Sequence, residues 1–72
     1  MPSLRAGDEV FRAVWASDVA FDGIRLEVFS HSGELWFDIS MPEGGDISVN
    51  TFNNAVPHKV LSAALDMAGK QR

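Results

Sequence analysis

The chain has no cysteine and only two histidines among its 72 residues. Without cysteine, neither a disulfide nor a thiolate metal site can stabilise the fold, and two histidines cannot complete a tetrahedral zinc site without several carboxylates. Positive charge is also scarce, because the formal net charge is −4. Nucleic-acid-binding proteins usually carry a basic stripe. We therefore expect a chain without cofactor or metal that does not bind nucleic acid directly.

Long apolar runs are missing as well. No run approaches the roughly 18 residues of a membrane-spanning helix, and Met1 to Arg5 lack the apolar stretch of a signal peptide. The glycine-containing segment at residues 43–46 is flanked by acids and is followed by neither lysine nor helix, which argues against a phosphate-binding loop. Since no nucleophile motif is present either, we expect a single non-enzymatic, cytoplasmic domain over residues 1–72, with residues 1–7 as a loosely held arm.

Two hairpin turn signals dominate what is present, Asp22-Gly23 and Ser32-Gly33. Counting outward from the second turn predicts three opposed pairs: Val28 with Phe37, Leu26 with Ile39, and Ile24 with Met41. Counting from the first predicts two more: Phe21 with Ile24, and Val19 with Leu26. Directly opposed residues share a face of a sheet. Both turns therefore assign Ile24, Leu26 and Val28 to one apolar face.

The periodicity along the chain predicts an α+β fold. Residues 24–30 and 35–41 alternate apolar and polar as strands do, and residues 47–52 form a short further strand. Residues 8–21 favour a strand, although a short helix at 8–15 followed by a strand at 18–21 is the alternative. A helix from Pro57 to Gly69, capped by Asn54 or Val56, would present one apolar stripe: Val60, Leu61, Ala64, Leu65 and Ala68. We expect a small antiparallel meander of three or four strands with this helix packed on one face, over Leu26, Val28, Phe37 and Ile39.

An aromatic pair is expected on the other face. If Val28 and Phe37 face the helix, Phe29 and Trp36 lie opposite each other on the side that a single helix leaves open. A continuous first strand would place Ala16 beside Phe29 and Trp15 on the helix side. Large, rigid, exposed rings are what protein interfaces favour, although such a pair can also simply stabilise the sheet.

Acidic residues are expected on the same open face. The predicted register aligns Asp18, Glu27 and Asp38 across three strands, with Arg25 nearby, whereas a bulge near Ser17 would remove the row. Because opposed like charges repel, a basic partner or a divalent cation could bind there. A solvated acidic face tempered by Arg25 is the simpler interpretation. The histidines, His31 and His58, are expected to be ordinary surface residues.

These features predict a small acidic, non-catalytic protein-interaction module. An inhibitor or adaptor, for example a phage or mobile-element antagonist of a host system, would occlude the basic surface of a partner protein. Its partner-binding residues would be Phe29, Trp36, Asp18, Glu27, Asp38 and Arg25. The alternatives are an obligate homodimer, formed by burying the aromatic face or by pairing the edge at residues 47–52, and a metal- or small-molecule-binding domain.

Overall fold

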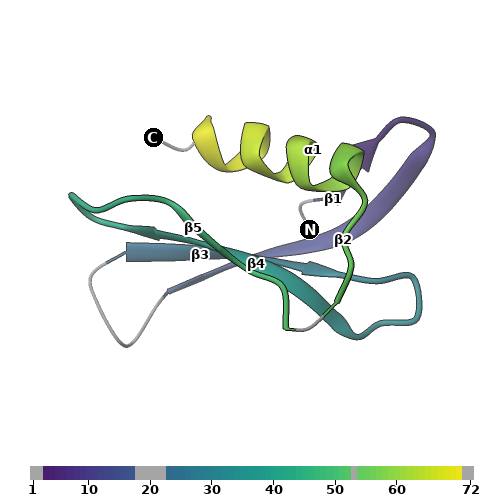
Figure 1. Ribbon diagram of the computed structural model, residues 1–72, viewed down its shortest axis with the longest axis horizontal. Helices are drawn as coiled ribbons and strands as arrows, with labels where there is room; N and C mark the ends of the chain where they lie inside the picture. The colour runs from purple at the N-terminus through teal and green to yellow at the C-terminus, as the bar shows by residue number, and fades with distance from the viewer. Residues whose placement is uncertain (1–2, 18–22, 53, 71–72) are drawn as a thin grey trace.

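The computed structural model describes residues 3–17, 23–52 and 54–70, and it confirms the α+β class. Five strands form one antiparallel sheet in sequence order, β1-β2-β3-β4-β5. A single helix, α1, covers one face of this sheet, and Figure 1 shows no element over the other face in the described residues. The elements are β1 (Ser3–Ala6), β2 (Glu9–Ser17), β3 (Gly23–Phe29), β4 (Leu35–Pro42), β5 (Ser48–Asn50) and α1 (His58–Gly69).

The first strand corrects the prediction of a loosely held arm at residues 1–7. Ser3–Ala6 pairs with the first part of β2, and the side chains of Leu4 and Ala6 are buried. A two-residue turn joins the strands, with Gly7 at a φ of 62°. Glycine at the first central position is typical of a type II′ hairpin turn. Residues 3–6 belong to the sheet because their alternate apolar side chains reach the core, whereas Met1 and Pro2 lie outside the described residues.

The second strand excludes the alternative of a helix at residues 8–15. Residues 9–12 of β2 pair with β1, and residues 13–17 pair with β3. Leu26 lies opposite Trp15 rather than the predicted Val19, which is a shift of four positions (19 − 15). Likewise Ile24 pairs with Ser17, so its predicted pairing with Phe21 is wrong. The predicted turn residue Asp22 lies outside the described residues.

Because this shift is an even number of residues, each residue of β2 still lies on the face of the sheet that was predicted for it. Side chains alternate with a period of two along a strand, so a shift by an even number returns each one to its original face. Trp15 thus lies on the helix side as predicted, whereas Ala16 lies beside Arg25 instead of Phe29.

The centre of the sheet agrees with the sequence. All three predicted pairs between β3 and β4 are confirmed, namely Val28 with Phe37, Leu26 with Ile39, and Ile24 with Met41. Four of these side chains have no solvent exposure and form the middle of the core: Leu26, Val28, Phe37 and Ile39. The last strand is shorter than predicted, since only Ser48–Asn50 pairs with β4.

The helix packs through one stripe onto this core. Val60, Ala64 and Ala68 are buried, while Leu65 is 37% exposed. Pro57 is the N-cap residue and no side chain caps the helix, so the predicted cap at Asn54 or Val56 is wrong. The Asn54 side chain instead donates a hydrogen bond to the Trp36 carbonyl, 3.0 Å away.

Candidate functional site

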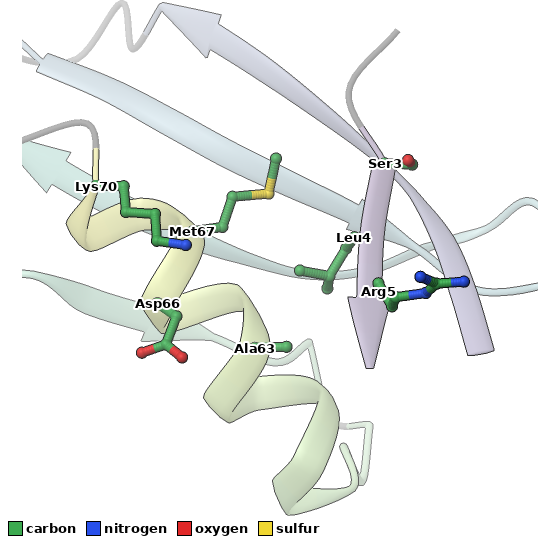
Figure 2. Close-up of a pocket in the computed structure, with 7 residues that line it drawn as sticks. All are labelled: Ser3, Leu4, Arg5, Ala63, Asp66, Met67 and Lys70. Carbon is green, nitrogen blue, oxygen red and sulfur yellow. The ribbon is translucent and has the colours of Figure 1, made fainter. Parts of the chain in front are cut away.

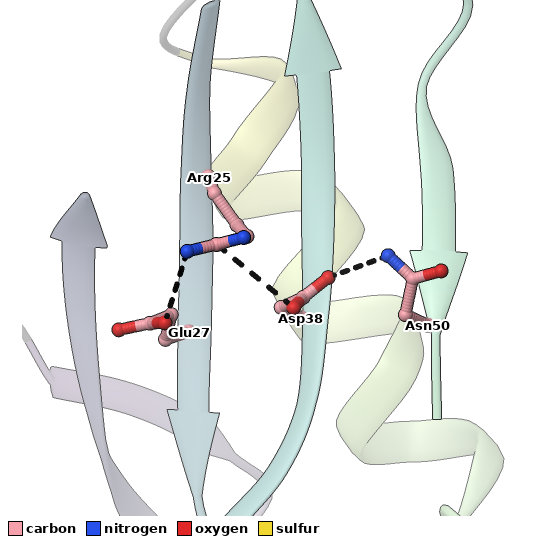
Figure 3. Close-up of polar contacts among 4 residues, drawn as sticks. All are labelled: Arg25, Glu27, Asp38 and Asn50. Carbon is pink, nitrogen blue, oxygen red and sulfur yellow. Dashed lines mark hydrogen bonds and ion pairs between the residues drawn. The ribbon is translucent and has the colours of Figure 1, made fainter. Parts of the chain in front are cut away.

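The face of the sheet opposite α1, here called the outer face, has a polar half and an apolar half. In the polar half, Arg25 of β3 lies between two carboxylates (Figure 3). Its Nη2 lies 3.6 Å from Oε2 of Glu27, and its Nε lies 3.9 Å from Oδ2 of Asp38. The Asn50 side chain on β5 donates a hydrogen bond of 2.8 Å to Oδ1 of Asp38. Three neighbouring strands are thereby linked by one polar cluster.

Burial distinguishes Asp38 from an ordinary surface acid. The residue is only 3% exposed, so its carboxylate depends on protein partners rather than water. Arg25 supplies the opposite charge and Asn50 the hydrogen bond, and both partners are oriented by strand pairing. The cluster therefore connects β3, β4 and β5, and its two carboxylates and one guanidinium (−2 + 1) leave a net charge of −1.

The predicted row of three acids is only partly present. Glu27 and Asp38 are directly opposed, as predicted. On the other side of Glu27, however, stands Val14 rather than Asp18, because of the four-residue shift. Asp18 itself lies outside the described residues. Within the described ranges, no group of three or more His, Cys, Asp or Glu side chains could hold a metal ion.

A bulge separates the predicted pair of Phe29 and Trp36. The loop after β3 is closed by hydrogen bonds from Gly33 N–H to Ser30 O and from Ser30 N–H to Glu34 O, both 2.9 Å. Three residues, 31–33, form this loop, whereas the prediction assumed a two-residue turn. Phe29 consequently pairs with Leu35, and the sheet returns to the predicted register at Val28 and Phe37. Trp36 is the extra residue of a β-bulge, left without a directly opposed partner.

The bulge also changes the surroundings of Trp36. Its ring lies 5.4 Å from the Phe11 ring and 5.9 Å from the Phe37 ring, centroid to centroid. Both of those phenylalanines are buried on the helix side. The indole is thus half-buried against the core, and the prediction that Trp36 shares the outer face with Phe29 is wrong.

The apolar half of the outer face contains Phe29 but not Trp36. The guanidinium carbon of Arg12 lies 4.2 Å from the centroid of the half-buried Phe29 ring, a cation–π geometry. Leu35, which is 37% exposed, lies directly opposite Phe29, and Val10, which is 50% exposed, precedes Arg12 by two positions on β2. We call these four residues, Val10, Arg12, Phe29 and Leu35, the outer patch.

A second cluster lies at the end of the sheet beside the first turn of α1. His31, predicted to be an ordinary surface residue, stacks on the Phe11 ring at 4.3 Å, and its Nε2 lies 3.3 Å from the Val10 carbonyl oxygen. Glu9 lies 3.1 Å from Lys59 Nζ and 4.0 Å from His31 Nδ1. These contacts join the β3–β4 turn and the helix to the start of β2, and they serve to hold the fold together.

A pocket lies between β1 and α1 (Figure 2), and the sequence reasoning did not anticipate it. Its volume is about 280 Å³. The residues that line it are Ser3, Leu4 and Arg5 on the strand, Ala63, Asp66 and Met67 on the helix, and Lys70 directly after the helix. The signal that could have revealed the strand was Gly7-Asp8, a glycine-first hairpin turn between two apolar stretches. Because β1 forms one wall of this pocket, a prediction without that strand cannot contain the pocket.

Comparison with known proteins adds no relative, because no protein-family model, curated protein or solved structure matches this chain. Among the described residues, the one helix is too short and too polar to cross a membrane. The fold and the outer patch therefore carry the functional argument alone.

Proposed function

We propose that the protein is a non-catalytic protein-interaction module that acts as an inhibitor or adaptor by covering a surface of its partner. The observation that carries this proposal is the outer patch. It combines a half-buried aromatic ring, two exposed aliphatic side chains and an arginine on one face that no described element covers. Aromatic residues and arginine are enriched where protein interfaces concentrate their binding energy.

The arrangement of charges on the outer face supports a partner of different chemistry from the one expected from the sequence. The two carboxylates on the outer face lie beside Arg25, and one of them is buried. The outer patch instead carries Arg12, which has no carboxylate partner among the described residues. Charge complementarity thus favours a partner with acidic and apolar groups at the contact, in place of the basic surface predicted from the sequence.

A matched pair of variants tests the proposal. Leu35 in the outer patch and Leu65 on α1 are both 37% exposed, so glutamate at either position introduces the same change at equal accessibility. The tagged protein is incubated with a lysate of its native host, and captured proteins are quantified by mass spectrometry. We expect Leu35→Glu to lose the specific partner that the wild type captures, and Leu65→Glu to retain it.

Two results would contradict this proposal. Equal capture by both variants would show that the outer patch makes no contact with the partner. A wild type that elutes as a dimer in size-exclusion chromatography, and becomes monomeric on Leu35→Glu, would assign the outer patch to self-association. Thermal melts of both variants serve as the folding control.

A further inference from the structure

In the part of the chain that the structure describes, β1 is an edge strand, and its free edge presents backbone groups that can accept another strand. Ala6 lies opposite Glu9 across a two-residue turn, so these two residues must exchange both of their backbone hydrogen bonds. Hydrogen-bonded and non-hydrogen-bonded pairs alternate along an antiparallel ladder. Leu4 therefore also bonds toward β2, whereas the N–H and C=O groups of Ser3 and Arg5 point away from it, toward the free edge.

The pocket beside this edge gives an added strand a second surface to contact. Leu4 is buried beneath it, and Ala63 and Met67 on α1 are half-buried along its other side. Figure 2 shows the Leu4 side chain directed toward the helix and the Arg5 side chain directed away from it. A strand added at this edge would place alternate side chains against Ala63 and Met67, which Asp66 and Lys70 flank, and the others on the outer face.

Cations outnumber acids in the pocket at this edge, where Arg5 and Lys70 face one acid, Asp66, although the whole chain is acidic. Arg5 and Val10 are directly opposed, and so are Ser3 and Arg12, which places Arg5 and Arg12 on the outer face. Lys70 lines the pocket on the helix side. None of these three cations has a carboxylate partner in the part of the chain that the structure describes. Acidic side chains on an added strand would lie next to Arg5.

We propose that the free edge of β1 binds an extended segment of a partner protein in which acidic residues alternate with apolar ones. The segment pairs with Ser3 and Arg5 as a sixth strand, directs its acidic residues toward Arg5 and packs its apolar residues against Ala63 and Met67. This inference rests on the proposed function and specifies the chemistry of the partner. A second copy of this chain is disfavoured as the occupant, because its own β1 would bring the same arginine to the contact.

The experiment uses phage-displayed random peptides selected on the immobilised full chain. The most enriched peptide is then synthesised with a fluorescent label, and its dissociation constant is measured by anisotropy. We expect enrichment of sequences that alternate acidic and apolar residues. We also expect the backbone amide signals of Ser3 and Arg5 to shift in ¹⁵N-correlated NMR spectra when the peptide is added.

Two substitutions test the geometry. Ser3→Pro removes an outward N–H without removing a bond between β1 and β2, as proline permits on an edge strand. It should weaken peptide binding about threefold to tenfold, the value of one hydrogen bond, while Ser3→Ala leaves binding unchanged. Arg5→Glu should weaken binding by a similar factor at low salt and by less at high salt, because screening reduces both attraction and repulsion.

The outcomes separate this inference from the proposed function. If the selection enriches no peptide, or enriches peptides without acidic residues, the inference is wrong. If a peptide binds the Ser3→Pro variant as tightly as the wild type but fails to bind Leu35→Glu, strand addition is wrong while the outer patch keeps its assigned role. Concentration-dependent dimerisation that Ser3→Pro abolishes would assign the edge to a second copy and overturn the inference.

Discussion

On the helix side of the sheet, the central side chains have no exposure and belong to one apolar cluster, whereas the outer face combines a polar cluster with exposed apolar groups. The difference follows from what covers each face. Helix α1 excludes water from one side, so apolar burial stabilises that side. The outer face has no such cover among the described residues, and its charged groups are held by one another. Stability should therefore reside mainly on the helix side, and recognition on the outer face.

Two phenylalanines provide the largest test of this comparison. Phe37 is fully buried, so Phe37→Ala should cost about 3–5 kcal/mol through lost burial and a cavity. That is a large share of the roughly 4–11 kcal/mol expected for a domain of this length. Phe29 is only half-buried, so Phe29→Ala should cost about 1 kcal/mol. Urea denaturation of both variants measures the contrast, and equal losses would refute the division of roles between the faces.

The stability cost of truncating Trp36 should lie between those of Phe37→Ala and Phe29→Ala. Its ring is half-buried and contacts the rings of Phe11 and Phe37, so Trp36→Ala should cost about 2–3 kcal/mol. Thermal unfolding with a matched Phe29→Ala sample checks the order. A Trp36→Ala variant as stable as the wild type would mean that the indole does not pack on the core.

The position of Trp36 shows which part of this structure the sequence predicts poorly. Alternation along residues 24–30 and 35–41 determined which residues of the two middle strands face the helix, because burial of four apolar side chains enforces one register. The loop at residues 31–33 was predicted one residue too short. The bulge that absorbs the extra residue changed the position of one side chain, Trp36, while all three pairs beyond it stayed as predicted. Local turn chemistry is weakly encoded, whereas a buried pattern is strongly encoded.

The candidate site was predicted less well for the same reason. Opposed Glu27 and Asp38, with Arg25 nearby, followed from the middle strands and were confirmed. The burial of Asp38 did not follow, since exposure depends on neighbours such as Asn50 that come from another strand. The pocket beside β1 was missed because Gly7-Asp8 was not interpreted as a turn.

Within the outer face, the polar cluster should be more sensitive than its surface location implies. Asp38→Ala leaves the Asn50 amide without this acceptor and removes a buried carboxylate beside Arg25, which should cost about 1–3 kcal/mol. Asp38→Asn retains an acceptor for Asn50 and should cost less. Glu27→Gln is the control, because Glu27 is part of a more exposed ion pair worth at most about 1 kcal/mol. If all three variants unfold at the same urea concentration as the wild type, the cluster contributes nothing to stability.

A smaller effect than those of Phe37 and Trp36 is expected at the turn beside Trp36. Gly33 has a φ of 91°, which side-chain-bearing residues rarely adopt, and a Cβ there would meet nothing within 4 Å. Gly33→Ala should therefore cost about 1–2 kcal/mol through backbone strain alone. Gly69 at the end of α1 has equally open space but no positive φ, so Gly69→Ala should be neutral or stabilise the protein by up to about 1 kcal/mol. The changes in the free energy of unfolding, measured by urea denaturation, should have opposite signs in the two variants if the backbone conformation of this turn constrains the register. Equal changes would show that Gly33 can be replaced freely while Trp36 keeps its contacts with the core.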